Sequence, residues 1–571
     1  MRLFYSSTVY ILVFLASLHA MGQTNSKQTP VLNASVKELA NLGKVWGLLK
    51  YHHPAVAKGV LDWDAELLKI LPLYLQAADK NTHNQIILKM IKDLGPVTTP
   101  SKPDSVISNL KEKPNFAWIQ KSGFSSELSN ILLDISHNHI AGKQKYLNPY
   151  TMDGATISLI TNELSYASVN ELTQGHKLIA VFRYWNIIEY WYPYKYMTPE
   201  KWETYLEKFV AEALASKDDL SYLLMVQKMV ATIRDSHAYA ASRKSQQMIG
   251  LRVLPFTVKF IGDQAVINSV DTVVYGLGNI KRGDVLRTIN GVAVSKLLAN
   301  NRPYISASNE AVVKREVAKL LNRSADSLVK ITVASADGST KEMLLKTAPI
   351  GAGFGAKKYD FAHQRDSTYF IKDKILYINM GKFMNDHAKA VIPLIKELKG
   401  IVIDGRQYPP KGGGSISMVL DEALMDKKRD FVIFSTVVEG YPGYFKYTEP
   451  MQSGADNPNY FKGLVTVLVN EETQSTGEFM TMAMKVIPNM KVVGSSTAGA
   501  DGNVTQAFQL PGGVSTVFTS LGVYYPNKKQ TQQIGIVPDV KVAQTVEGFR
   551  NGKDEMLEKA LNLIREFKRK N

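Results

Sequence analysis

A serine with the local setting of a nucleophile follows an apolar, strand-like run in the C-terminal half of the chain. Residues 464–469 (Leu-Val-Thr-Val-Leu-Val) lead into Asn470-Glu-Glu-Thr-Gln-Ser475-Thr-Gly-Glu478, which has the composition of a helix start. A serine at such a strand-to-helix turn lies at the edge of a sheet, beside helix amides that can stabilise an oxyanion. Ser475 is therefore a candidate nucleophile, and the Thr476 N–H is a candidate oxyanion donor. The Ser475/Glu478 spacing also fits a capping box, and local sequence alone favours that interpretation.

A serine needs a base, and the N-terminal half offers one at the end of an internal repeat. Trp46 and Trp63 match Trp185 and Trp202, each pair 139 positions apart, and helical periodicity follows in both copies. The second copy ends in Ile233-Arg-Asp-Ser-His237, whereas the first ends in Ile91-Lys-Asp-Leu-Gly95. This asymmetry suggests that His237 belongs to a site, although a lone histidine after a helix is more often structural.

Several motifs of the C-terminal half occur in a recognisable order. They are Asp404-Gly-Arg406, the Asn470–Glu478 segment, Val493-Gly-x-x-Thr497-x-Gly499 and Gly535-Ile-Val-Pro-Asp539. In order and spacing this set resembles the tail-specific (C-terminal processing) serine peptidases. The resemblance covers residues 246–547 and implies that Ser475 is the nucleophile.

Two arrangements of the general base occur in that family. One uses a lysine after Thr-x-Gly, but Ala500 occupies that position here. The other, tricorn-like arrangement uses a histidine from a helical domain, and it matches His237 together with Ser236 as a supporting hydroxyl. The resemblance then implies an acid that orients the histidine, at the position where this chain has Gln532.

The remaining oxyanion donor is expected from a glycine loop after Arg406. The family usually has Asn-x-Gly-Gly there, whereas this chain has Gln407-Tyr-Pro-Pro-Lys-Gly-Gly-Gly414. The displaced glycines leave Gly412 and Gly413 as candidates. The amide at Gln532 leaves three possibilities open: a slow enzyme, another carboxylate such as Asp235 or Glu478 in place of the acid, or a site that has lost its activity.

The elements that must position these residues are predicted from periodicity. Apolar strands at 375–379, 400–404, 431–434 and 464–469, with helices at 388–398 and 476–486, indicate an α/β core with a sheet buried on both faces. Before it, alternating segments and the Gly283-Asp and Asn290-Gly pairs resemble a PDZ domain, which binds peptides at a sheet edge. The usual carboxylate-binding Gly-Leu-Gly-Phe loop is absent, so peptide binding stays open.

The fold class expected is multidomain: a duplicated N-terminal helical module, a PDZ-like β domain, and an α/β protease core that the resemblance implies to be ClpP/crotonase-like. The boundaries expected are a signal peptide at 1–22, the first helical copy at 33–145, a connector and second copy at 146–243, the PDZ-like domain at 246–350, the core at 355–547 and a C-terminal helix at 552–571.

Composition excludes some classes of site. The chain has no cysteine, so disulfides, thiolate metal sites and a cysteine nucleophile are excluded. The net charge of +16 comes from dispersed Lys and Arg residues, and nucleic acid is therefore not an expected partner. No cofactor or metal is implied, because metal-ligand clusters, phosphate loops and dinucleotide fingerprints are absent from the sequence.

The first 22 residues combine a basic start, an apolar run and small residues before Gln23, as in a cleaved signal peptide. No later run is long enough for a membrane helix, so a periplasmic or secreted protein is expected. The function predicted is a serine endopeptidase acting on proteins or peptides. The alternatives are a catalytically weak or inactive peptide- or glycan-binding envelope protein on the same scaffold, and a purely structural scaffold. The sequence leaves the oligomeric state open.

Overall fold

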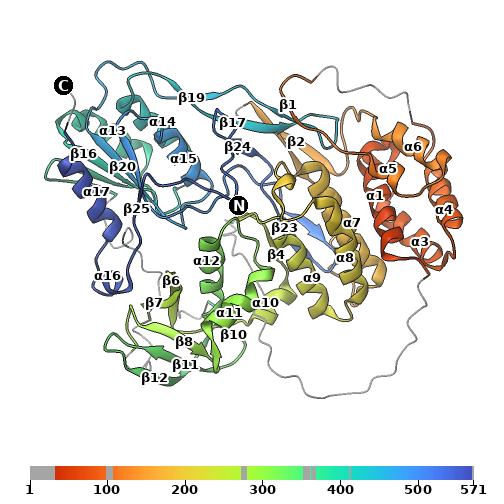
Figure 1. Ribbon diagram of the computed structural model, residues 1–571, viewed down its shortest axis with the longest axis horizontal. Helices are drawn as coiled ribbons and strands as arrows, with labels where there is room; N and C mark the ends of the chain where they lie inside the picture. The colour runs from red at the N-terminus through yellow and green to blue at the C-terminus, as the bar shows by residue number, and fades with distance from the viewer. Residues whose placement is uncertain are drawn as a thin grey trace.

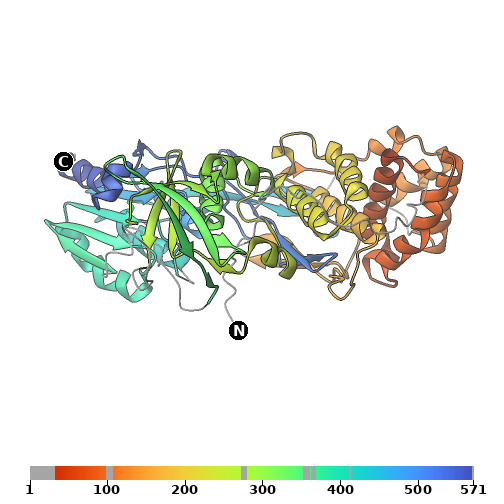
Figure 2. The same cartoon turned by 90° about the horizontal axis from the view of Figure 1, so that it is seen from below.

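The protein is an elongated row of modules, seen in the computed structural model of Figures 1 and 2. The structure describes residues 33–97, 107–152, 154–271, 280–351, 361, 368–410 and 413–568, and the predicted signal peptide lies outside them. The helical modules form one end of the row and the α/β core the other, with a small β domain beside the middle (Figure 1).

The two copies of the sequence repeat have helices at corresponding positions. The first contains α1 (Val36–His52), α3 (Trp63–Gln76), α4 (Lys80–Asp93) and α6 (Ser126–Ser136), and the second contains α7 (Gln174–Trp191), α8 (Tyr205–Ala215) and α9 (Asp219–Ala231). Both α4 and α9 begin after an aspartate N-cap, Asp79 and Asp218, whose side chains accept the backbone N–H of Thr82 and Ser221.

The tryptophan pairs that define the repeat make the same contact in both copies. Trp46 stacks on Trp63, and Trp185 stacks on Trp202, each with ring centroids 6.4 Å apart. In each pair both indole N–H groups donate to the partner's backbone carbonyl. One 139-residue spacing therefore corresponds to one local structure, in which each indole has a buried acceptor.

A buried ionic network fixes the helical modules to the core. The Arg183 guanidinium is fully buried and binds the carboxylates of Asp64 and Glu163 and the carbonyl oxygen of Gln509, which belongs to the core. The Lys50 ammonium also binds Glu163, at 2.6 Å. The network therefore links both helical copies to the core, and its charges are paired as charges in the interior need to be.

Between the copies, a hairpin of β2 (Leu147–Met152) and β3 (Ala155–Ile160) forms the predicted connector.

The β domain that follows has a sheet in the order β12-β11-β8-β7-β6. Its elements are β6 (Phe256–Ile261), β7 (Gln264–Val270), β8 (Val285–Ile289), β9 (Val292–Ala293), α11 (Val294–Asn301), α12 (Glu310–Leu320), β11 (Leu328–Ala334) and β12 (Thr340–Lys346). Asn290 and Gly291 both have positive φ and turn β8 into β9, as the Asn-Gly pair predicts.

The core contains a six-stranded sheet in the order β14-β15-β16-β20-β21-β25. The strands β15 (Ile375–Asn379), β16 (Gly400–Asp404), β20 (Leu464–Val469), β21 (Met490–Gly494) and β25 (Val540–Lys541) run parallel, and β14 (Tyr369–Lys372) is an antiparallel edge. One face packs on α13 (Asn385–Val391), α14 (Gly413–Leu424) and α15 (Thr476–Met484), and the other on α17 (Glu555–Glu566). Burial on both faces explains why β15, β16 and β20 are continuous apolar runs.

One predicted strand belongs elsewhere. The 431–434 run lies in β17 (Arg429–Val437), which is not part of the parallel sheet. Instead, β17 pairs antiparallel with β18 (Phe445–Tyr447), β19 (Met451–Ser453) and β24 (Gly522–Tyr524). Its apolar side chains are buried because Phe431 and Phe434 pack on Phe479 of α15. An apolar run alone does not reveal which sheet buries it.

Candidate active site

Ser475 stands on a strained turn between β20 and α15. Its backbone has φ 53° and ψ −121°, a left-handed conformation that is costly for a residue with a side chain. An ordinary N-cap residue has extended backbone angles, so the capping-box pattern of the sequence does not account for this geometry. Strained turns of this kind present a nucleophilic serine at the top of an α/β sheet.

Glu478 holds the turn in place. Its fully buried carboxylate accepts the backbone N–H groups of Gly499 (2.8 Å), Ala500 (3.0 Å) and Ser475 (3.3 Å), as well as the Thr497 hydroxyl. The Ser475 N–H also donates to the Ala500 carbonyl oxygen, at 3.0 Å. Burial raises the pKa of Glu478, and the hydrogen bonds oppose that rise. Glu478 thus acts as a brace between α15 and the 497–500 loop.

His237 reaches the core because the strand after it joins a core sheet. The short strand β4 (Tyr239–Ala241) pairs antiparallel with β23 (Val514–Val517), which in turn pairs with β22 (Phe508–Leu510). The half-buried His237 lies two residues before β4, so the end of the second helical copy is tied to the core by main-chain hydrogen bonds.

The His237 ring and Asp235 meet at Thr519. The His237 Nδ1 atom lies 2.8 Å from the Thr519 hydroxyl oxygen, which lies 2.9 Å from Asp235 Oδ1. Asp235 is fully buried and also accepts the backbone N–H groups of His237 (3.0 Å) and Thr519 (2.6 Å). Burial lowers the pKa of His237 and the charge of Arg315 lowers it further, while Asp235 opposes this. A lowered pKa keeps the imidazole neutral, as a general base requires.

The residues that precede Ser475 and His237 in the sequence, Gln474 and Ser236, are hydrogen-bonded to each other. The Gln474 side-chain amide donates to the Ser236 carbonyl oxygen at 3.3 Å, and the Ser236 hydroxyl donates to the Ala498 carbonyl oxygen at 3.0 Å. Within the described part of the chain, no direct hydrogen bond joins the Ser475 hydroxyl to His237. The segments that carry Ser475 and His237 are therefore in contact through Gln474, Ser236 and Ala498.

Ser236 has a structural position as well. Its hydroxyl accepts the backbone N–H of Ser308, and its own backbone N–H donates to the Ser308 hydroxyl. The Asp235 backbone N–H donates to the Ser306 hydroxyl, and that hydroxyl donates to the Asp235 carbonyl oxygen. The 235–237 segment is therefore held between the β domain and the core.

The other predicted site residues lie as follows. Gln532 is fully buried, and its side chain lies beside the Tyr192 hydroxyl. The side chain that contacts His237 Nδ1 is that of Thr519. Thr476 is the first residue of α15, where a backbone N–H has no acceptor within the helix. Gly412 lies outside the described residues, and Gly413 is the first residue of α14. Among the described residues, no group of three or more His, Asp or Glu side chains is arranged to hold a metal ion.

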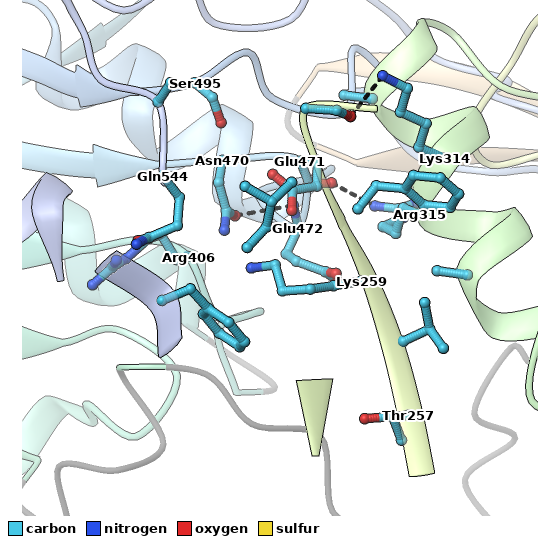
Figure 3. Close-up of a pocket in the computed structure, with 18 of the residues that line it drawn as sticks. Thr257, Lys259, Lys314, Arg315, Arg406, Asn470, Glu471, Glu472, Ser495 and Gln544 are labelled. Carbon is cyan, nitrogen blue, oxygen red and sulfur yellow. Dashed lines mark hydrogen bonds between the residues drawn. The ribbon is translucent and has the colours of Figure 1, made fainter. Parts of the chain in front are cut away.

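A cavity of about 480 Å³ lies between the β domain and the core (Figure 3). One wall is formed by β6 and α12, including Lys259, Lys314 and Arg315, and the opposite wall by Arg406 and the 470–472 loop of the core. The Arg315 guanidinium bridges the walls, because it donates to the Glu471 carbonyl oxygen (2.7 Å) and to the Gln474 side-chain oxygen (2.8 Å). The cavity is thus connected to the residue that precedes Ser475.

The sequence profile of peptidase family S41 matches residues 374–542. This segment is a family S41 domain. The match confirms the tail-specific protease family that the motifs predict, and the S41 domain contains Ser475 and Thr519, whereas His237 is supplied from outside it.

Curated relatives agree with this family. A protein of Staphylococcus haemolyticus named "Probable CtpA-like serine protease" is 28% identical over 240 residues, which cover 41% of this chain and 46% of the relative. A protein of the same name from Staphylococcus aureus strain N315 is 32% identical over 191 residues, covering 32% and 36%. The chain thus spans less than half the length of these relatives.

Solved structures share the fold beyond the S41 domain. Mature CPAF in complex with lactacystin superposes with a TM-score of 0.54 at 14% identity, covering 69% of this chain and 99% of CPAF. Another structure of mature CPAF gives a TM-score of 0.51 at 14% identity, covering 69% and 97%. At this identity the likeness concerns the fold alone.

The sequence motifs did not reveal Thr519. It lies outside every quoted motif, and only the β4–β23 pairing brings it to His237. A usable signal was the β-branched composition of residues 514–517 (Val-Ser-Thr-Val), which is typical of a strand, but the partner of that strand is not encoded locally.

Proposed function

We propose that this chain is a serine endopeptidase that hydrolyses peptide bonds through an acyl-enzyme on Ser475, with His237 as general base. The observation that carries the proposal is the strained φ of Ser475 on the strand-to-helix turn of an S41 domain, beside the 235–237 segment. The relatives named as serine proteases support the same reaction.

In the proposed reaction, His237 Nε2 takes the Ser475 hydroxyl proton while Oγ forms a bond to the substrate carbonyl carbon. The Thr476 N–H, and a backbone N–H near Gly412 or Gly413, stabilise the oxyanion. The protonated histidine then gives its proton to the departing amine as the C–N bond breaks. Water, deprotonated by His237, hydrolyses the acyl-enzyme and restores Ser475.

We propose further that the β domain is a PDZ-like peptide-binding module. The strand β6 pairs only with β7 among the described strands, and α12 lies against it beside the cavity. An extended peptide adds a strand at such an edge. Substrate chains bound there would lie next to Arg315, and through its hydrogen bond next to Gln474.

A location outside the cytoplasm follows from the signal-like residues 1–22. Within the described ranges, no helix has the length and apolar character needed to span a bilayer. We therefore propose a periplasmic or secreted enzyme.

The alternative is a peptide- or glycan-binding protein on a protease scaffold, favoured by an amide at position 532 where the family has an acid. Digestion of an unfolded protein such as casein distinguishes the two. The mature chain should degrade it and Ser475→Ala should not. Binding without turnover in both proteins would support the alternative.

A further inference from the structure

Thr519 and His237 come together just beyond the end of the β4–β23 pairing. Val517 pairs with Tyr239 at that end, and Thr519 follows Val517 by two residues while His237 precedes Tyr239 by two. The side chains of the two residues are in contact there, with His237 Nδ1 2.8 Å from the Thr519 hydroxyl oxygen. Thr519 is fully buried, as is Asp235 behind it.

The direction of these hydrogen bonds follows from Asp235. Its two oxygens receive the Thr519 hydroxyl and the N–H groups of His237 and Thr519, and a carboxylate can only accept. The Thr519 hydroxyl proton therefore points to Asp235, which leaves the Thr519 oxygen as an acceptor toward His237. The His237 Nδ1 atom must then be the donor, and Nε2 keeps its lone pair.

We propose that Thr519 is the positioning residue of His237, carrying the orienting effect of Asp235 to the imidazole in place of a directly bonded acid. This inference rests on the proposed function. When Nε2 takes the Ser475 proton, the Nδ1–H continues to donate to Thr519, and the Thr519 proton stays on its own oxygen. The imidazolium charge is stabilised by Asp235 one hydroxyl away, which is weaker than a direct carboxylate bond.

A merely structural Thr519 would tie the 235–237 segment to the core without selecting a tautomer. The tautomer is read by nitrogen NMR of the full chain with ¹⁵N-labelled histidine, and His237→Gln assigns the signal. Wild type should be the Nδ1–H form. Thr519→Val should shift the ring toward Nε2–H, and Thr519→Ser should restore it. In Asp235→Asn the new amide can donate to Thr519, which turns the hydroxyl toward His237 and should also give Nε2–H.

Thr516→Val is the matched control. Thr516 is a buried threonine of β23 whose hydroxyl has no hydrogen-bond partner among the described residues, so its replacement should leave the His237 tautomer unchanged. In turnover, Thr519→Val should lower kcat/KM by roughly 10²–10⁴-fold, the range for loss of a correctly oriented general base, with recovery in Thr519→Ser.

The inference is overturned if wild-type His237 is Nε2–H, or if Thr519→Val has the wild-type tautomer. Failure of the proposed function looks different. In that case wild type shows no turnover, while the tautomer shifts still occur as described.

Discussion

The Gln474 side chain and the Ser236 carbonyl oxygen are hydrogen-bonded at 3.3 Å, although 238 residues separate them. Gln474 directly precedes Ser475, and Ser236 directly precedes His237. Two segments that are far apart in the sequence are therefore joined at the positions next to the proposed nucleophile and base. The proposed site therefore requires the second helical copy to be docked on the S41 domain.

Ser475→Ala and His237→Ala should each lower kcat/KM by roughly 10⁴–10⁶-fold, and the double variant should be no worse than either single one. Nucleophile and base act as a unit, so removing either removes the same chemistry. Steady-state hydrolysis of a fluorogenic peptide measures this. Additive losses would show that the two residues contribute independently.

The acidic limb of the kcat/KM profile should lie below pH 6.5. The active base is neutral, and activity is lost as pH falls through its pKa, which burial and Arg315 lower from the ordinary value of 6.5. Arg315→Gln removes a positive charge, so the limb should move to higher pH.

Arg315→Lys is the matched variant, because it disturbs the bonds to Glu471 and Gln474 but keeps the charge. Its acidic limb should stay closer to that of wild type. A limb that moves to lower pH in Arg315→Gln would contradict this account of the His237 pKa.

Ser475→Gly should be more stable than Ser475→Ala by about 1 kcal/mol. Glycine adopts positive φ freely, while alanine keeps a strain of order 1–3 kcal/mol, and the greater freedom of glycine in the unfolded chain offsets part of the gain. Urea unfolding of the two inactive variants compares them directly. Equal stability would mean that the turn at Ser475 is not strained.

Asp554→Ala should destabilise the core by about 3–5 kcal/mol. The Arg406 guanidinium is buried between Asp404 and Asp554, and loss of one partner leaves an incompletely paired charge. Arg406 also begins the loop whose Tyr408 hydroxyl lies 3.3 Å from the Thr476 hydroxyl, so activity should fall with stability.

Glu558→Ala is the comparison variant, because Glu558 lies in α17, the helix that Asp554 caps. Glu558 pairs with Lys553 at 3.3 Å, but both side chains are 53% exposed, and such a pair contributes less than about 1 kcal/mol. A loss of stability in Asp554→Ala no greater than in Glu558→Ala would contradict a structural role for the buried pair.

Local patterns predicted the parts of the fold that depend on local chemistry. The β15, β16 and β20 strands follow from continuous apolar runs, and the matching Trp46–Trp63 and Trp185–Trp202 pairs follow from one spacing. The turn at Ser475 follows from the apolar run 464–469 and the helix-start residues after it, whereas its role as nucleophile came from the order of the motifs. These features need only information from neighbouring residues or from a repeat.

Features that depend on tertiary register were not predictable. Thr519 meets His237 across 282 residues of chain, through a three-residue strand that no periodicity could pair with β23. Gln532 occupies the expected position in the sequence, yet its side chain lies beside Tyr192. A motif fixes a position along the chain, whereas packing decides which polar atom reaches the histidine.

Labelling by a fluorophosphonate probe tests the central claim most directly. The protein would be treated with the probe, digested, and mapped by mass spectrometry, with Ser475→Ala and His237→Ala in parallel. The account predicts one modified residue, Ser475, with labelling absent in Ser475→Ala and strongly slowed in His237→Ala. Undiminished labelling of Ser475→Ala, or a folded wild-type protein that takes up no probe, would contradict it.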